Sequence, residues 1–254
     1  MTVTPVPVLL YHSVSDASDA REDQWSVRVR DFRADMDVIL ESGRTPVTAD
    51  QYGRCLRGEA DLPARPVLIT FDDGFADFAD TVLPILCAAG FSATLFVTTG
   101  WVGRSRMLSA AALRQIGGVP GIEIGAHSVS HPHLDVVRQD NARQEMLESK
   151  RFLEDHLQHP IASFAYPHGS HRRATRSLAV EAGFRNAHAV KNAMSHHGDD
   201  PFAVARFTVH GRTTRQQVAD VVNGGGVRLA PRRERIRTRA YRVVRFARHW
   251  AAHG

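Results

Sequence analysis

The sequence predicts an α/β fold: a distorted (β/α) barrel of about seven parallel strands with a basic helix at the C-terminus. Short apolar runs alternate along the chain with longer segments of helical periodicity. Such alternation is typical of a parallel sheet covered by helices, either doubly wound or closed into a barrel. The residues with catalytic chemistry follow the expected strands, and α/β barrels assemble their active sites at the carboxyl ends of strands. The barrel is therefore favoured.

The expected strands and helices alternate in order along the chain. The strands are short apolar or β-branched runs that cover residues 7–11, 67–71, 93–97, 122–126, 161–164 and 204–209. The helices are segments in which apolar residues recur every three or four positions: 29–40, 75–89 with a bend near Pro84, 109–116, 137–156, 172–182 and 214–222. Glycines follow several of these segments and are expected to end them: Gly43, Gly90, Gly117 and Gly183.

The composition excludes several classes of protein. With 254 residues, 43% hydrophobic and 23% charged, the chain does not resemble collagen, a wholly disordered protein or a disulfide scaffold. No apolar run approaches the roughly 20 residues of a membrane span. Cys55 and Cys87 lie far apart without a CxxC motif, so buried free thiols are expected. No basic leader precedes the first apolar stretch, which favours the cytoplasm or the inner face of the membrane.

The positive charge is concentrated near the C-terminus. Residues 228–254 contain nine arginines and one glutamate, whereas the rest of the chain carries 23 basic and 26 acidic residues. We therefore expect a barrel domain over residues 1–226 and an Arg-rich amphipathic tail over residues 227–254. The apolar residues of the tail recur at helical spacing: Ile236, Ala240, Val243, Val244, Ala247 and Trp250.

Such a basic amphipathic helix has two interpretations. It suits an anionic membrane surface, and it also suits docking on the domain or on a partner subunit. Nucleic acid is not an expected partner, because the tail has neither an aromatic stacking platform nor a recognisable reading motif.

The sharpest local feature is the sequence TFDDG at residues 70–74, directly after an apolar strand. Neighbouring strand residues point in opposite directions, so adjacent aspartates can serve one site only where the backbone turns. Gly74 permits such a turn. Asp72 and Asp73 can then divide the work, one binding a metal and the other moving a proton. An ordinary Asp-Asp-Gly turn is the alternative.

A pair of histidines follows another expected strand, 122–126. His127 and His131 lie in the sequence HSVSH, and histidines four residues apart can converge on one point where the chain coils. Two histidines and one carboxylate form a recurring catalytic metal set with open positions for water and substrate. Since the chain has 14 histidines, chance spacings are common, and only the combination with the two aspartates indicates a metal site.

These two motifs resemble those of the polysaccharide deacetylases of carbohydrate esterase family four, which share a chitooligosaccharide deacetylase homology domain. The resemblance covers residues 5–222. It implies that Asp73, His127 and His131 bind a divalent metal, and that Asp72 is the general base. Zn²⁺ is the expected metal for such a set, with Co²⁺, Ni²⁺ and Mn²⁺ as alternatives.

A third family motif departs from its usual form. Where the family has R-x-P-Y/F-G, this chain has AYPHG at residues 165–169, without the arginine. The sequence is similar to the branch that acts on poly-N-acetylglucosamine-like polymers. The resemblance places Tyr166, Pro167 and His168 at the substrate groove, with the backbone amide of His168 holding the oxyanion.

The same branch carries its acid histidine near the N-terminus rather than in a late L-x-H motif. The sequence LYH at residues 10–12 fits this arrangement, so the resemblance implies that His12 is the general acid. His188 and His210 are the alternatives. Arg206 is similar to a buried arginine that orients the base aspartate in the family, and an exposed strand arginine is the alternative.

The resemblance implies a metal-dependent hydrolase that removes N-acetyl groups from N-acetylglucosamine-containing glycans or their precursors and releases acetate. The metal polarises the acetamide carbonyl and activates a water, Asp72 takes the proton of that water, and His12 protonates the departing amine. Two alternatives stay open: a related barrel hydrolase of a small non-sugar amide, and a catalytically silent glycan-binding module.

Overall fold

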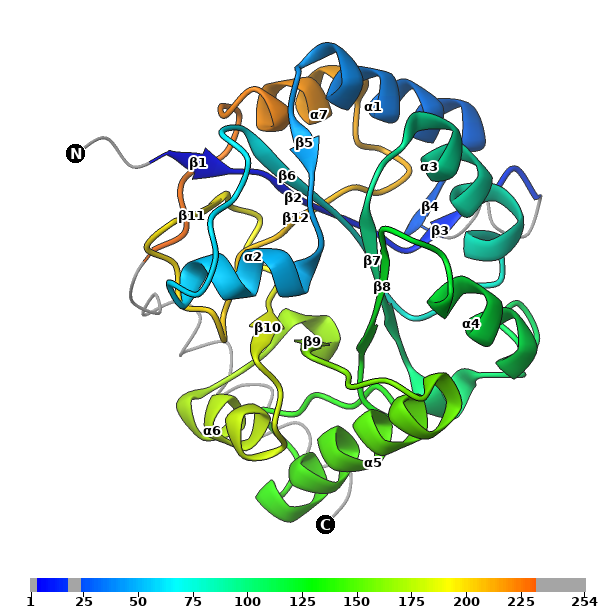
Figure 1. The fold of residues 1–254 in the computed structure, drawn as a ribbon, viewed down its shortest axis with the longest axis vertical. Coiled ribbons are helices and arrows are strands. Elements are labelled where there is room, and N and C mark those ends of the chain that lie inside the picture. Colours follow the sequence, from blue (N-terminus) through cyan, green and yellow to red (C-terminus); the bar gives the residue numbers. More distant parts are fainter. Residues whose placement is uncertain (1–3, 18–23, 232–254) are drawn as a thin grey trace.

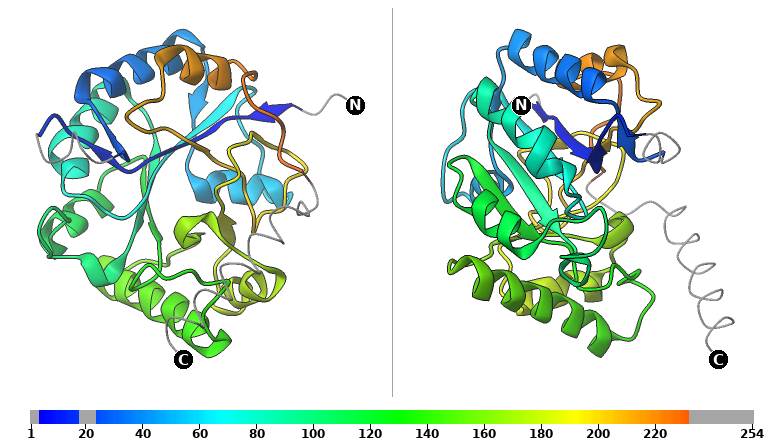
Figure 2. Two further views of the ribbon diagram at one scale, coloured as in Figure 1. Left: turned by 180° about the vertical axis from the view of Figure 1, so that it is seen from behind. Right: turned by 90° about the vertical axis from the view of Figure 1, so that its right-hand side faces the viewer.

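The structure, a computed structural model, describes residues 4–17 and 24–231. The strands form a curled parallel sheet at the centre, and the helices lie around it (Figures 1 and 2). Along the sheet the strand order is β10-β9-β8-β7-β6-β2-β12, with β5 beside β6. The expected α/β fold, a distorted barrel of about seven parallel strands, is confirmed.

All neighbouring strands of the central sheet are parallel. In chain order these strands are β2 (Val8–Tyr11), β5 (Thr45–Pro46), β6 (Pro66–Phe71), β7 (Ala93–Val97), β8 (Ile122–Ala126), β9 (Ser163–Ala165), β10 (Asn186–His188) and β12 (Phe207–Thr208). Two small sheets flank them, one of β1 (Pro5–Val6) with β11 (Ser195–His196) and one of β3 (Ser13–Val14) with β4 (Ser26–Val27). An isolated bridge between His188 and Val204 links β10 to the chain that enters β12, so the sheet curls towards closure.

The helices form the outer layer. In chain order they are α1 (Val29–Glu41), α2 (Ala49–Leu56), the π-helix η1 (Phe78–Val82), α3 (Leu83–Ala89), the 3₁₀ helix η2 (Thr99–Trp101), α4 (Ala110–Gly117), α5 (Gln139–Leu157), the 3₁₀ turn η3 (Pro167–Gly169), α6 (Arg173–Glu181) and α7 (Arg215–Val222). Figure 1 shows α1 and α7 together on one side of the sheet and α5 and α6 on the opposite side. The expected bend near Pro84 is the change from η1 to α3.

The core lies between the sheet and the helices. Every residue of β6 and of β7 is buried, and the amphipathic helices add side chains such as Phe32 and Leu153, both fully covered. Because burial of apolar surface contributes roughly 25 cal/mol per Å², this layer supplies most of the stability that holds the strand ends in place.

Strand β10 was missing from the expected strands because its residues are polar. Asn186 and His188 point into the curled sheet, where Asn186 Nδ2 donates to Ser163 Oγ at 2.9 Å and Asn186 Oδ1 lies 3.2 Å from His188 Nε2. A strand that satisfies polar side chains inside the barrel shows no apolar run in the sequence. The expected strand 204–209 is also shorter than predicted, since only Phe207–Thr208 forms a strand and Val204 has an isolated bridge with His188.

Helix α2 was missed although the sequence carries its start signal. Thr48 and Gln51 form a capping box, in which each side chain accepts a hydrogen bond from the other residue's backbone amide. Gly117, expected as a helix stop, is the last residue of α4, so this helix ends where the sequence predicts. A Cβ at Gly117 would lie 2.7 Å from Leu157 Cδ2, so this glycine permits the close approach of α4 to α5.

The last described residues pack on the barrel. Leu229 forms a parallel bridge with Met194, and Ala230 is buried beside Ala193 and Ala205. Residues 232–254, which hold most of the expected basic tail, lie outside the described residues, so its helix and the boundary at 226 stay predictions. Among the described helices, none has both the length and the apolar character needed to cross a membrane. The two cysteines are free, as expected, but their expected burial is wrong, since Cys55 is half-buried and Cys87 is an exposed residue of α3.

Candidate metal centre and active site

The expected site residues come together at one edge of the sheet. Asp72 follows β6, His127 follows β8, Tyr166 follows β9 and His12 follows β2. Since these strands are parallel, their carboxyl ends meet at the same edge, which is where (β/α) barrels place catalytic groups. Arg206, directly before β12, reaches the same place from the last strand.

Asp73, His127 and His131 form a group that could hold a metal ion. Their three ligand atoms all lie within 4.8 Å of one another. Asp73 Oδ1 is 3.4 Å from His131 Nε2 and 3.7 Å from His127 Nε2. Two ligands at about 2.1 Å from a tetrahedral zinc ion are separated by about 3.4 Å. The spacing of the three donors therefore fits a small divalent cation.

The protonation of the two histidines also fits a metal site. The Nδ1–H of His127 donates to the carbonyl oxygen of Ala165 at 2.8 Å, which directs the Nε2 lone pair towards Asp73. Burial lowers the pKa of His127, and burial together with the charges of His127 and His168 lowers the pKa of His131 to about 2. Both imidazoles are therefore neutral, and the neutral form is the one that binds metal.

Several residues in the loops around this group adopt a backbone conformation that non-glycine residues rarely adopt. Asp73 has φ 76°, Ser128 has φ 65°, His131 has φ 61° and His168 has φ 58°. Each left-handed non-glycine residue costs about 1–3 kcal/mol, and such residues gather at functional sites. The turn expected at Gly74, where φ is 87°, thus begins one residue earlier and separates the side chain of Asp73 from that of Asp72.

Asp72 forms a buried ion pair with Arg206. Arg206 Nη1 donates to Asp72 Oδ1 at 2.6 Å, and Nη2 donates to Oδ2 at 2.7 Å. The exposed fractions of the two side chains are 3% for Asp72 and 0% for Arg206. Burial by itself raises the pKa of Asp72, but the charge of Arg206 and its hydrogen bonds hold the pKa well below its usual range. Of the two interpretations of Arg206, the structure has the buried one.

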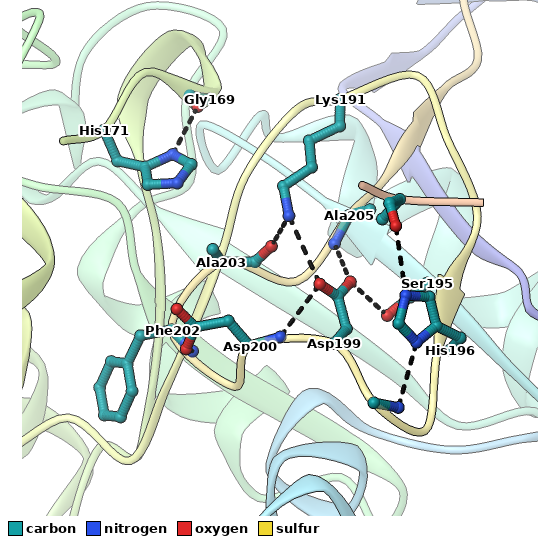
Figure 3. A network of polar contacts seen from close by, with 12 residues as sticks. Gly169, His171, Lys191, Ser195, His196, Asp199, Asp200, Phe202, Ala203 and Ala205 are labelled. Atoms are coloured by element: carbon teal, nitrogen blue, oxygen red, sulfur yellow. Dashed lines mark hydrogen bonds and ion pairs between the residues drawn. The ribbon is translucent and has the colours of Figure 1, made fainter. Parts of the chain in front are cut away.

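The chain before Arg206 is held by the network drawn in Figure 3. Asp199 accepts hydrogen bonds from Ser195 Oγ at 2.8 Å and from the amide of Ala205 at 3.2 Å. Lys191 donates to the carbonyl oxygen of Ala203 and lies 3.5 Å from Asp199. These contacts fix the residue next to Arg206, so the guanidinium enters the barrel from a rigid segment.

His12 is half-buried at the same edge, and its charge contributes to the low pKa of Asp72. Its ring lies 5.1 Å from the ring of Trp25. Asp77 holds the adjacent backbone, because Asp77 Oδ2 accepts from Ser13 Oγ at 2.6 Å and Oδ1 accepts from the amide of Val14 at 3.2 Å.

The two alternative acids have other contacts. His188 is fully buried inside the sheet next to Asn186. His210 Nδ1 accepts a hydrogen bond from the amide of Arg212 at 3.2 Å, within a turn. His12 is thus half-buried at the edge where Asp72 lies, His188 is buried inside the sheet and His210 lies in a turn, and the identity of the proton donor stays a prediction.

The residues of the third motif differ in exposure. Tyr166 is fully buried, and its hydroxyl donates to the carbonyl oxygen of Phe202 at 3.1 Å. Pro167 is buried too, whereas His168 is exposed. The ring of His168 stacks on His133 at 3.8 Å and lies 4.4 Å from the ring of His131. Tyr166 and Pro167 therefore support the loop from below, and His168 is the side chain that faces outwards.

Several residues near the group were not found from the sequence. Trp101 packs against His131 with 5.2 Å between ring centroids, and Trp25 packs against His12. Glu145 binds the loop between the two metal-ligand candidates. Neither tryptophan belongs to a motif, and Glu145 has the spacing of an ordinary exposed helix residue, so no signal in the sequence singles them out.

The chain is similar to known deacetylases in sequence. The family model described as "Polysaccharide deacetylase" matches residues 59–187. A protein of Bacillus subtilis (strain 168) with the name "Putative polysaccharide deacetylase YxkH" is 26% identical over 180 residues, which is 71% of this chain and 62% of that protein. Poly-beta-1,6-N-acetyl-D-glucosamine N-deacetylase of Escherichia coli (strain K12) is 37% identical over 93 residues, 36% of this chain and 14% of that protein. The chain thus spans less than two thirds of the length of these relatives.

A solved structure shares the fold. The deacetylase PplD of Streptococcus pyogenes, solved in complex with acetate, aligns with a TM-score of 0.80 at 22% identity, over 87% of this chain and 99% of that chain. The matched region of the family model, residues 59–187, contains the aspartates after β6, both histidines after β8 and the loop after β9. This match covers just over half of the 254 residues, so the chain belongs to the polysaccharide deacetylase family.

Proposed function

We propose that this chain is a metal-dependent hydrolase that removes N-acetyl groups from N-acetylglucosamine-containing glycans or their precursors. Family membership supports the reaction class. The name of the Escherichia coli relative, which states poly-beta-1,6-N-acetyl-D-glucosamine as its substrate, supports the class of sugar. Acetate and a free amine on the sugar are the products.

One observation carries the proposal: an ionised carboxylate lies beside a metal-ligand set without belonging to it. Asp72 Oδ2 is 3.6 Å from His127 Nε2, while both oxygens of Asp72 are held by Arg206. A general base must lie within reach of the water that it deprotonates. Asp72 meets this requirement, and the Asp73 side chain is left for the metal.

Asp73, His127 and His131 would hold the metal. A divalent cation bound there supplies Lewis acidity to the acetamide carbonyl and makes water easier to deprotonate. We expect zinc, because two histidines and a carboxylate are a common zinc set; cobalt, nickel and manganese can use the same donors.

The residues of the chain divide the remaining steps. Asp72 takes the proton of the attacking water, and Arg206 keeps Asp72 ionised and aligned until then. The amide of His168 donates a hydrogen bond to the oxyanion of the tetrahedral intermediate. His12 then protonates the nitrogen of the departing amine, and the C–N bond breaks to give acetate.

The test is acetate release by purified full-length protein loaded with zinc. The substrates are chitooligosaccharides, poly-N-acetylglucosamine and a panel of small non-sugar amides, and bound metal is measured in parallel. We expect acetate from the sugars and one zinc ion per chain. Acetate from small amides alone would favour the small-amide hydrolase, and glycan binding without acetate release from any substrate would favour the silent binding module.

We also propose an anionic membrane surface as a partner of the tail. The support is the arginine-rich amphipathic pattern of residues 232–254. The test is sedimentation with phosphatidylglycerol vesicles, comparing the full chain with a chain ending at residue 231, which keeps the packing of Leu229 on Met194. Equal sedimentation of both chains would contradict membrane binding and, with it, the expected association with the inner membrane face; the expected cytoplasmic location stays a separate prediction.

A further inference from the structure

We propose that Glu145 is a positioning residue that holds the His127–His131 loop in the conformation that binds metal. This inference rests on the proposed function, since it assumes that the two histidines are metal ligands. Glu145 lies on α5, whose residues Ala142 and Met146 are buried against the core. The side chain therefore starts from a fixed helix.

The loop between the two histidines requires external support. Ser128 and His131 have φ values of 65° and 61°, in the left-handed region that costs non-glycine residues about 1–3 kcal/mol each. The loop makes one internal contact that helps, from the amide of His131 to Ser128 Oγ at 3.0 Å. The loop also pairs with η2, where the amide of Gly100 donates to the carbonyl oxygen of Val129 at 2.9 Å.

Glu145 supplies three more contacts, all on the two residues in the middle of the loop. Glu145 Oε2 accepts hydrogen bonds from the amides of Val129 and Ser130, both at 2.8 Å. Glu145 Oε1 accepts from Ser130 Oγ at 2.6 Å. Hydrogen bonds to an ionised carboxylate are stronger than neutral ones. One side chain thus holds the segment that separates His127 from His131.

The place of these contacts indicates that they control the spacing of the two histidine ligands rather than the stability of the whole protein. Glu145 contacts the loop at a place where Ser130 is exposed and Val129 and Glu145 are half-buried. The loss of the contacts therefore leaves the apolar core intact. It allows the loop to leave its left-handed conformation, and His131 Nε2 would then move from its place 3.4 Å from Asp73 Oδ1.

The experiment measures the affinity of the metal-free full chain for Zn²⁺ by competition with a chromophoric chelator. Glu145→Ala should bind zinc about 10–100-fold more weakly than the wild type, the range found when groups that orient metal ligands are removed. Glu145→Gln should stay within about threefold of the wild type, because its amide oxygen can accept from both amides and its NH₂ can donate to Ser130 Oγ. The matched control is Glu148→Ala, an exposed residue of the same helix that contacts Gln144 instead of the loop.

Thermal unfolding of the metal-free proteins accompanies each titration, and the Tm of Glu145→Ala should stay near that of the wild type. If Glu145→Ala does not fold, Glu145→Asp replaces it, because a carboxylate shortened by one methylene group cannot reach both amides; the same loss is expected. Unchanged zinc affinity in the folded variant, or an equal loss in Glu145→Gln, would overturn the positioning role.

The same titration separates this inference from the proposed function. His127→Ala should abolish tight zinc binding in either case. If His127→Ala loses zinc and Glu145→Ala keeps it, only the role of Glu145 is wrong. If the wild type itself binds no zinc, or binds it equally without His127, the proposed metal centre is wrong and the role of Glu145 with it.

Discussion

Asp72 and Asp35 lie equally deep in the molecule but differ in charge. The exposed fraction is 3% for Asp72 and 4% for Asp35. Burial raises the pKa of Asp35 to about 7, and its hydrogen bond from the hydroxyl of Tyr11, 3.0 Å long, lowers the pKa only in part. Asp72 faces the guanidinium of Arg206, which holds its pKa well below the usual range.

The difference shows what a buried carboxylate requires to stay ionised inside a barrel. Burial in a medium of low dielectric favours the neutral acid, and a neutral donor such as a tyrosine hydroxyl does not reverse this effect. A guanidinium with two parallel hydrogen bonds does reverse it. Asp72 therefore carries a charge at the mouth of the sheet, whereas Asp35 is a packing residue on α1 whose charge depends on pH.

The strongest test of this comparison removes the cation. Arg206→Met removes the cationic partner of the buried Asp72 carboxyl, and breaking a buried ion pair on one side costs about 3–5 kcal/mol of unfolding free energy. Acetate release should fall by about 10²–10⁴-fold, because Asp72 becomes a protonated acid that cannot act as a base. Urea unfolding and acetate release measure the two effects. Arg206→Lys keeps the charge but loses the two parallel hydrogen bonds, so its stability and its acetate release should lie between those of the wild type and those of Arg206→Met. A stable, active Arg206→Met protein would contradict the comparison.

The next test neutralises Asp72 and leaves Arg206 in place. Asp72→Asn should reduce acetate release by about 10²–10⁴-fold while bound zinc stays near one per chain. Asp73→Asn is the matched variant, and it should lose zinc. A loss of zinc from Asp72→Asn as large as that from Asp73→Asn would mean that the two aspartates do not divide the work as proposed.

The third test concerns Asp35, whose ionisation lowers the stability of the folded protein. An unfolded aspartate ionises near pH 4, whereas Asp35 in the folded protein ionises near pH 7. The free energy of unfolding therefore falls as pH rises from 4 to 7, by at most about 4 kcal/mol from this group. Asp35→Asn should gain stability over the wild type as pH rises from 5 to 8, with acetate release unchanged. A gain that does not vary with pH would contradict the raised pKa.

The smallest effect is expected from Tyr11→Phe. The substitution removes the hydroxyl group whose hydrogen bond favours the ionised form of Asp35, at a cost of about 1–2 kcal/mol of unfolding free energy. Because the folded pKa of Asp35 then rises further, the loss should be larger at pH 8 than at pH 5. In the Asp35→Asn background this pH dependence should disappear, and urea unfolding of the four proteins measures it. Equal losses at both pH values would contradict the coupling.

Short-range patterns predicted the fold class and most of its elements. The apolar runs of β6, β7 and β8 and the periodicity of α1, α5 and α7 appear in contiguous stretches of the sequence, so they can be recognised without knowledge of the fold. Of the missed elements, β10 depends on tertiary partners, because its polar side chains are satisfied inside the sheet. Helix α2, in contrast, has a local capping box that the sequence does carry.

The candidate site likewise has some features that the local sequence predicts and others that depend on the folded structure. The spacing of His127 and His131 and the turn after Asp73 are local properties, and a single sequence was enough to group them as metal-ligand candidates. The distances within the group, and the neutral state of its histidines, depend on the burial of strand ends that only the folded sheet provides.

By itself, the amino-acid sequence determined the alternation of strands and helices, the two motifs and the separate charge of the last residues. Tertiary structure alone decided that Arg206 is buried against Asp72, across 134 positions of the chain, and that Asp35 pairs with the hydroxyl of Tyr11 instead. It also placed His12 half-buried at the edge of the sheet where Asp72 lies, and buried His188 completely. The physical reason is that periodicity and spacing are set by neighbours in sequence, whereas the charge of a buried group is set by whatever side chain the fold places against it.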